Sequence, residues 1–456
     1  MRVTTISDFH PAPGSVLEFT ARPAAGAEFR PSPVPPSMNQ RFHLDSARGS
    51  GLAPPWLAFT FDVPGELDAA ALHEVFAEWI ARHEALLSRF REQDGEVVRE
   101  LLPADGVELQ RREVGELPTT AAVREHFRRR FTAQCHPLGW PPFLLGAVRR
   151  AGSATVFGAF DHANADAYSI AVAAHEIQAL YRERTAGIPA DLPATGSFVD
   201  YCAREQADSA PPDPDEPALV CWREFLRGCG GTVPAFPLDL GVAPREPVPQ
   251  RSETRQLLDA RAADGFEAAC RAGAGTPFTG VLAAFGLALH ARGAEPRNRL
   301  LIPMHTRHQS RWWQAMGWFT TNAPIDFPVE PGDFGRTLES ANAAFRRALE
   351  TLDVPLHRVL GALAGEFGMV RKDVFMLSYV DYRELPLSLE FPGADAHHIS
   401  SETDADDAQF WVSRNRDGMF LRSRFPGTAR ARETMADFHA AFAAALEEVA
   451  GSLVLR

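Results

Sequence analysis

The segment FDHANADAYS, residues 160–169, contains a histidine and an aspartate four positions apart, His162 and Asp166. Imidazole is the side chain whose ordinary pKa lies closest to 7, so a neutral histidine can remove a proton from an attacking hydroxyl or amine. The chain has 15 histidines, and this spacing also fits an ordinary loop histidine that is hydrogen-bonded to its neighbours. On spacing alone, both interpretations stay open.

The elements around His162 favour the chemical interpretation. Residues 155–160 are β-favouring, and from Tyr168 onward apolar residues recur three or four positions apart, which predicts a strand followed by a helix. His162 then lies in the loop after a strand, where polar side chains often carry function and are costly to bury without a purpose. Residues 56–63 likewise predict a strand, and residues 68–83 predict an amphipathic helix. The first fifty residues, rich in proline and glycine, predict an irregular surface segment.

A loop-like region between Thr185 and Pro217 ends in the proline-rich stretch ADSAPPDPDEP. We therefore divide the chain into residues 1–188 and residues 189–456. In the second part, Thr276 and Pro277 are typical of the start of a helix over residues 278–292. Further predicted elements are strands at residues 300–304 and 375–380 and helices at residues 334–351 and 430–449. Because strands and helices alternate in both parts, we expect two α/β lobes of similar construction with a cleft between them.

Composition and motifs exclude several classes of function. The net charge of −13 argues against a nucleic-acid partner. The five cysteines are scattered without a CxxC pair, which argues against a zinc site or a disulfide framework and favours a cytoplasmic protein. No apolar stretch reaches the roughly 20 residues that a bilayer requires, so we expect no transmembrane segment. No GxSxG, GxGxxG or HExxH motif occurs, and we expect neither a metal nor a bound cofactor.

Several segments, in this order, together resemble the condensation-domain superfamily, whose members join an activated acyl group to an amine or alcohol. They are PPSMNQRFHL (35–44), GELDAAALHEVFAEWIARHEALLSRF (65–90), FDHANADAYS, FVDYCAREQ (198–206), MGWFTTNAPI (316–325) and LDVPLHRVL (352–360). FDHANADAYS is similar to the family motif HHxxxDGxS. The segments TTISDFHPAPGS, VPAFPLDLG and FWVSRNRDG look like the free-standing, polyketide-synthase-associated acyltransferases of mycobacteria, which acylate sugars.

The resemblance implies an α/β fold of two-layer, α+β lobes, each like chloramphenicol acetyltransferase, arranged as a pseudo-dimer in a V with a central tunnel. His162 matches the second histidine of the motif, which implies that it is the catalytic base. Asp166 matches the motif aspartate, which supports the active loop through an arginine, and Arg307 stands at the matching position. The residues implied to line the substrate tunnel are Asp161, Ser169, Gly317, Trp318 and Asn322.

The function implied by the resemblance is acyl transfer in natural-product or lipid biosynthesis, from a phosphopantetheine thioester to a hydroxyl or amine. The expected donor is an acyl- or peptidyl-carrier protein acting in trans, or acyl-coenzyme A. The expected acceptor is a small molecule. We expect the protein to act as a monomer.

Two positions depart from the family motif. Asp161 replaces its first histidine, and Ala167 replaces the glycine that follows the aspartate. A carboxylate beside His162 is expected to favour the protonated imidazole or to contact a polyol acceptor. Alanine is expected to fit a left-handed loop conformation less well than glycine. These departures keep open a second reading, in which the chain is a non-catalytic condensation-like module that recruits a carrier protein or a partner enzyme.

Overall fold

The computed structural model describes residues 1–49, 53–207, 210–385 and 395–452, and these residues form two compact units. Unit 1 consists of Met1–Asp208, Thr306–Thr320 and Glu384–Thr403, and unit 2 consists of Ser209–His305, Thr321–Arg383 and Asp404–Arg456. These bounds differ from the predicted single division at residue 188. Unit 1 continues further because the helix at residues 198–206 buries its apolar side chains in the unit 1 core.

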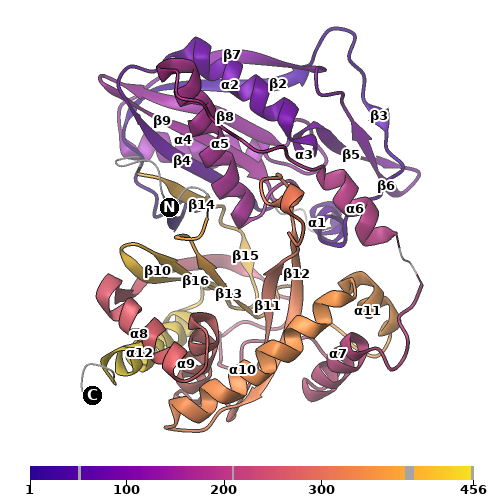
Figure 1. Ribbon diagram of the computed structural model, residues 1–456, viewed down its shortest axis with the longest axis vertical. Helices are drawn as coiled ribbons and strands as arrows, with labels where there is room; N and C mark the ends of the chain where they lie inside the picture. The colour runs from indigo at the N-terminus through magenta and orange to yellow at the C-terminus, as the bar shows by residue number, and fades with distance from the viewer. Residues whose placement is uncertain (50–52, 208–209, 386–394, 453–456) are drawn as a thin grey trace. The chain divides into compact units, whose positions relative to one another are not determined.

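Unit 1 contains a mostly antiparallel, seven-stranded sheet in the order β1-β14-β4-β9-β8-β2-β7 (Figure 1). Its strands are β1 Arg2–Thr5, β2 Gly14–Pro23, β4 Trp56–Pro64, β7 Val107–Leu117, β8 Phe143–Arg150, β9 Ser153–Asp161 and β14 His397–Ser400. A smaller sheet contains β3 Arg30–Pro31, β5 Ser88–Gln93 and β6 Glu96–Leu101. The helices are α1 Met38–Gly49, α2 Ala69–Arg82, α3 Glu84–Leu87, α4 Thr120–Gln134, α5 Ala167–Ala186 and α6 Phe198–Gln206.

The predicted irregular conformation of the first fifty residues is wrong. β2 lies inside the large sheet between β8 and β7, and α1 follows it along the chain. Val16, Leu17 and Phe19 of β2 are fully buried. Many of the prolines lie between these elements. The proline-rich composition therefore obscured the signal of a short apolar strand whose partners are distant in sequence.

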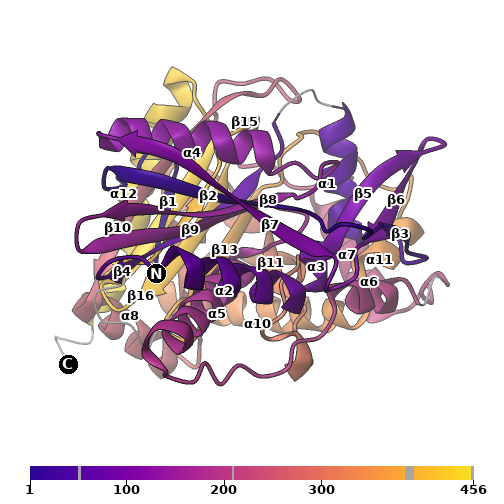
Figure 2. The same cartoon turned by 90° about the horizontal axis from the view of Figure 1, so that it is seen from above.

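The packing of β9 fixes the position of the loop that follows it. β9 pairs with β4 along its whole length, and its last residue, Asp161, lies opposite Trp56. Helices α2 and α5 cover one face of the sheet, and α4 covers the other (Figure 2). Phe160 is buried in the core beneath α2 and α5, whereas Phe157 packs in the core beneath α4. Strand side chains alternate between the two faces of a sheet, and β9 is buried on both faces. A shift by one residue would place every side chain on the wrong face, so β9 has one register and the loop with His162 starts at a fixed point.

Unit 2 contains a second seven-stranded sheet, in the order β12-β11-β13-β16-β17-β10-β15. Its strands are β10 Val248–Asp259, β11 Arg297–His305, β12 Thr320–Pro328, β13 Met376–Asp381, β15 Asp404–Ala405, β16 Gln409–Asn415 and β17 Gly418–Pro426. Its helices are α7 Pro217–Gly228, α8 Ala260–Ala272, α9 Pro277–Ala291, α10 Phe334–Glu350, α11 Leu356–Ala362 and α12 Ala429–Ser452, and it also contains the short 3-10 helix η2 Thr351–Asp353. A second 3-10 helix, η1 Ser310–Trp312, belongs to unit 1. Thr276 caps α9 in a capping box, as its sequence predicts.

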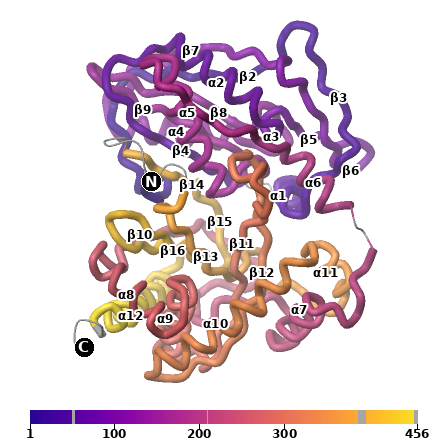
Figure 3. The backbone as a smooth tube through the Cα atoms, in the orientation of Figure 1, coloured from indigo at the N-terminus to yellow at the C-terminus, as the bar shows by residue number. Residues whose placement is uncertain are grey.

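The α/β fold class is confirmed, because each unit is a sheet covered by helices. Figure 3 follows the chain from β11 through residues 306–320, which belong to unit 1, and on into β12.

Among the described residues, no single helix is long and apolar enough to cross a membrane, although α8 and α9 together, bent by 96°, meet that test by length and composition.

Candidate active site

His162 lies in the loop between β9 and α5, as the sequence predicts. Its backbone N–H donates a hydrogen bond to the carbonyl of Pro55 at 3.2 Å, which holds the loop against the start of β4. The imidazole is partly exposed, and its Nδ1 atom is buried with no partner among the described residues other than its own backbone. The indole of Trp318 stacks on this ring, with centroids 4.0 Å apart and an angle of 31° between the planes.

The surroundings keep the His162 ring neutral. Burial, followed by the charge of His43, lowers the pKa of His162 to about 4. The contact with its own backbone and the charges of Asp161 and Asp166 act in the opposite direction, with smaller effects. At pH 7 the imidazole is therefore in the form that accepts a proton.

Asp166 and Arg307 lie together, as the resemblance implies. Nη2 of Arg307 donates to Oδ1 of Asp166 at 3.0 Å, and both side chains are buried. Asp166 is also the N-cap of α5, where Oδ1 accepts from the backbone N–H of Ser169 at 2.7 Å. Its Oδ2 accepts from the backbone N–H of Phe319 at 3.0 Å. Through this one carboxylate, the loop after His162 is tied to residues 306–320.

Ser169 and Gly317 complete the same connection. The hydroxyl of Ser169 is fully buried, donates to the carbonyl of Gly317 at 2.8 Å and accepts from Arg307 at 2.8 Å. Ser169 therefore supports the loop, whereas the resemblance placed it in the tunnel lining. Gly317 has a φ of +154°, and a Cβ atom there would lie 2.4 Å from the side chain of Phe198. Only glycine fits this position, which brings the following residue, Trp318, onto His162.

We expect Gly317→Ala to destabilise unit 1 by about 1–3 kcal/mol, because an added methyl group overpacks a filled core. The same change should displace Trp318 and lower the catalytic rate. The urea-unfolding midpoint and the tryptophan fluorescence measure the two effects. Gly361→Ala in α11 is the matched control, because no atom lies within 4 Å of the place that its methyl group would take and alanine is the better helix former. Equal midpoints for the two variants would refute the steric argument.

Asp161 does not take the place expected for it. Its carboxylate is fully buried, and it accepts from Nε2 of His43 at 3.0 and 3.1 Å and from the N–H of Ala163 at 2.8 Å. A group buried in this way is not open to a polyol acceptor. Its charge raises the pKa of His162 by less than the other groups lower it, so it does not hold the ring protonated.

The departure at Ala167 also leaves the loop undisturbed. Ala167 is the first residue of α5, directly after the N-cap Asp166. It is not among the described residues with positive φ. Helical backbone accepts alanine readily, so no glycine is required at this position.

Two residues of α1 belong to the site and had no role in the sequence-based prediction. His43 contacts Asp161, and Gln40 donates from Nε2 to the carbonyl of Ala163 at 2.8 Å. Their spacing of three residues places both on one face of a helix. That signal was present in PPSMNQRFHL, but it depends on a helix that the proline-rich surroundings obscured.

A second polar cluster, around Glu176, connects the elements that carry the site. The buried carboxylate of Glu176 in α5 accepts from Nε1 of Trp79 at 3.0 Å and from Nε2 of His83 at 2.6 Å. It also pairs with Arg82. Nδ1 of His83 accepts from the backbone N–H of Met316 at 3.5 Å. These bonds hold α2, α5 and residues 306–320 together.

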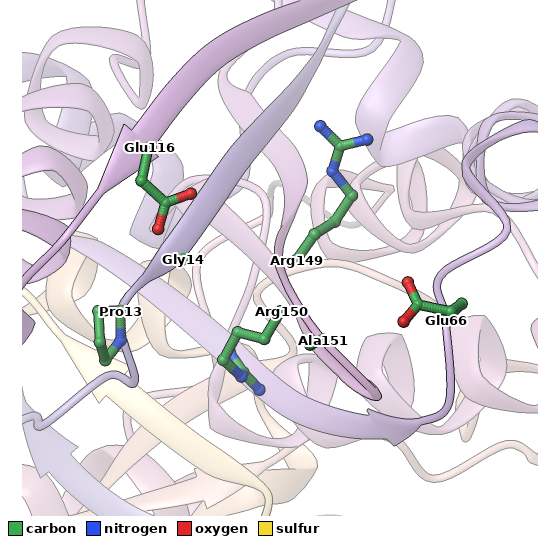
Figure 4. A pocket seen from close by; sticks show the side chains of 7 residues that line it. All are labelled: Pro13, Gly14, Glu66, Glu116, Arg149, Arg150 and Ala151. Carbon is green, nitrogen blue, oxygen red and sulfur yellow. The ribbon is translucent and has the colours of Figure 1, made fainter.

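The remaining predicted features lie elsewhere or stay predictions. Asn322 belongs to unit 2, and its place in a tunnel, like the tunnel itself, stays a prediction. Within the described part of the chain, no group of three or more His, Cys, Asp or Glu side chains could hold a metal ion. A surface pocket of unit 1 shares no residue with the His162 site (Figure 4). It is lined by Pro13, Gly14, Glu66, Glu116, Arg149, Arg150 and Ala151.

Comparisons with known proteins place this chain among acyltransferases. The sequence pattern of the condensation domain matches residues 56–412. Trehalose-2-sulfate acyltransferase PapA2 of Mycobacterium tuberculosis is 31% identical over 96% of this chain and 95% of that protein. Acyltransferase PapA3 of the same species is 28% identical over 99% and 97%.

Solved structures give the same result for the fold. A structure of PapA2 acyl transferase matches 99% of this chain and 100% of that chain, with a TM-score of 0.89 and 27% identity. The X-domain from teicoplanin biosynthesis matches 94% of this chain and 98% of that chain, with a TM-score of 0.72 and 20% identity. The second likeness concerns the fold alone.

Proposed function

The chain belongs to the condensation-domain family and is an acyltransferase, and from this premise we propose that His162 is the general base for acyl transfer from a thioester to a hydroxyl group. The observation that carries the proposal is the state of the His162 ring: neutral, partly exposed, stacked on Trp318 and free to use a ring nitrogen. The donor is carried on the phosphopantetheine arm of a carrier protein or of coenzyme A.

The chemistry requires little beyond this base. A thioester is already activated, so the protein must align the acceptor with the carbonyl carbon, exclude water and accept one proton. His162 takes the hydroxyl proton as the oxygen attacks and a new C–O bond forms. The tetrahedral intermediate then collapses, the C–S bond breaks, and the imidazolium returns its proton to the leaving thiolate. Nearby backbone N–H groups or the imidazolium stabilise the oxyanion.

Trp318 has a part in the same step. A pKa near 4 makes the free ring a weaker base than ordinary histidine. The face of an indole attracts a cation, so the stacked Trp318 stabilises the imidazolium as charge develops on it. The ring is thus neutral before the reaction and gains a favourable contact when it is protonated.

The acceptor that we propose is a hydroxyl group of a sugar. A relative that covers almost the whole chain is named a trehalose-2-sulfate acyltransferase, and trehalose offers only hydroxyl groups for acylation. An amine acceptor is the alternative that the assay must compare.

A recruiting, non-catalytic module is the less favoured reading. It depended on Asp161 and Ala167, and the structure accommodates both departures while His162 stays in the loop after β9. The test is thiol release from acyl-coenzyme A or an acyl-carrier thioester, with and without trehalose or an amine. Release that depends on the sugar supports the proposal, whereas binding of a carrier without any release supports the module.

The pH dependence of catalysis follows from the lowered pKa. A general base must be neutral, so kcat/KM is lost only as the pH falls through the pKa of the free enzyme. For His162 this loss is centred near pH 4, and kcat/KM should stay constant from pH 8 down to about 5. An ordinary histidine would instead give a midpoint near 6.5. Initial rates measured between pH 5 and 8 separate the two, and a midpoint between 6 and 7 contradicts a base whose pKa is lowered by its surroundings.

A further inference from the structure

The carboxylate of Asp161 lies next to His162 in sequence and requires compensation. It is fully buried, and apart from the N–H of Ala163 its hydrogen bonds come from His43 alone among the described residues. A buried negative charge without a partner would favour the protonated form of a neighbouring imidazole. The compensation for this carboxylate therefore comes from another element, α1.

His43 reaches Asp161 from α1, across 118 positions of sequence. Its ring is nearly buried and lies 6.5 Å from the His162 ring and 6.0 Å from the Trp318 indole, measured between centroids. Gln40, one turn earlier on α1, holds the helix to the carbonyl of Ala163. The helix is therefore fixed on both sides of His162, at Asp161 and at Ala163.

We propose that His43 is a positioning residue, which pairs with Asp161 and so sets the charge beside His162 and keeps that imidazole unprotonated. The consequence for the reaction rate rests on the proposed function, but the effect on the His162 ring does not. Among the described residues, the titratable groups that act on His162 are His43 from α1, Asp161 from β9 and Asp166 from the start of α5, and Asp166 pairs with Arg307 from residues 306–320. Substitutions at His43 and Asp161 therefore change the electrostatics near His162 without breaking the Asp166–Arg307 pair.

The test is a titration of the histidine rings by NMR, in the full chain labelled at histidine, with His162→Ala identifying the His162 signal. His43→Gln keeps a hydrogen-bond donor for Asp161 but removes the imidazole ring. It should raise the pKa of His162 by about one pH unit or more, because the buried carboxylate is no longer balanced. In the double variant His43→Gln/Asp161→Asn the pKa should return towards its starting value. His10→Gln, at an exposed histidine, is the control that should change nothing.

An unchanged pKa in His43→Gln overturns the proposal. If that variant does not fold, Asp161→Asn and the double variant provide the comparison. The carboxylate raises the pKa of His162 and His43 lowers it, so Asp161→Asn should have a lower His162 pKa than the double variant. Equal pKa values in these two variants also overturn the proposal. Because the titration needs no substrate, failure to observe acyl transfer would reject the proposed function and leave this result standing. In an active enzyme, the acid limb of kcat/KM should move with the pKa.

Discussion

We expect His162→Ala to lower kcat by about 100- to 10,000-fold, the usual contribution of a general base, if His162 has the proposed role. The protein should remain folded, because the His162 ring leaves no buried partner unpaired among the described residues when it is removed. The main structural loss is the stacking on Trp318, which is worth about 0.5–1.5 kcal/mol. Single-turnover rates by rapid quench, with circular dichroism and thermal unfolding on the same sample, measure both quantities.

The control for this variant is His10→Ala, which removes an exposed histidine. It should retain full activity and stability. His162→Gln adds a second check, because glutamine preserves much of the side-chain volume but is not a base at neutral pH. If either His162 variant turns over at the rate of the unchanged protein, His162 is not the base.

Asp166→Asn should lower both stability and rate. The change keeps the shape of the side chain but removes the negative charge that balances the buried Arg307. Breaking one partner of a buried ion pair costs about 3–5 kcal/mol, since the other charge remains buried and unpaired. The N-cap of α5 and the bond to Phe319 weaken together, so the loop that carries His162 loses its connection to residues 306–320. Urea-unfolding midpoints and kcat, compared with the unchanged protein, measure the loss.

Glu125→Gln is the matched control for Asp166→Asn. Glu125 and Arg128 form an exposed pair on α4, and such pairs contribute about 0–1 kcal/mol. A loss at Asp166 no larger than the loss at Glu125 would show that the Asp166–Arg307 pair does not support the loop. A loss of stability without a loss of kcat would show that Asp166 supports the fold but not catalysis.

The elements that hold His162 could be predicted because their signal is local. The periods of β4, α2, β9 and α5 are visible in short windows of sequence, and the N-cap at Asp166 falls between two of them. β2 was missed for the opposite reason. Its ten residues are stabilised by pairing with β7 and β8, and nothing in the local composition shows those partners.

The parts of the site that could not be predicted from the sequence depend on contacts between distant parts of the chain. Asp166 and Arg307 are 141 positions apart, and only the family resemblance related them before the structure brought them to 3.0 Å. The resemblance gave no role to His43, whose partner Asp161 stands where the motif has its first histidine. The stacking of Trp318 on His162 likewise depends on the backbone conformation of Gly317, which no spacing reveals.

The most direct test of the account is the mass of the acceptor after incubation with an acyl thioester. Trehalose, the thioester and the unchanged protein should give a product heavier by one acyl group, and His162→Ala under the same conditions should give almost none. Equal amounts of acylated sugar from both proteins, or no acylated acceptor with coenzyme A and carrier donors alike, would contradict a transferase that depends on the neutral imidazole of His162.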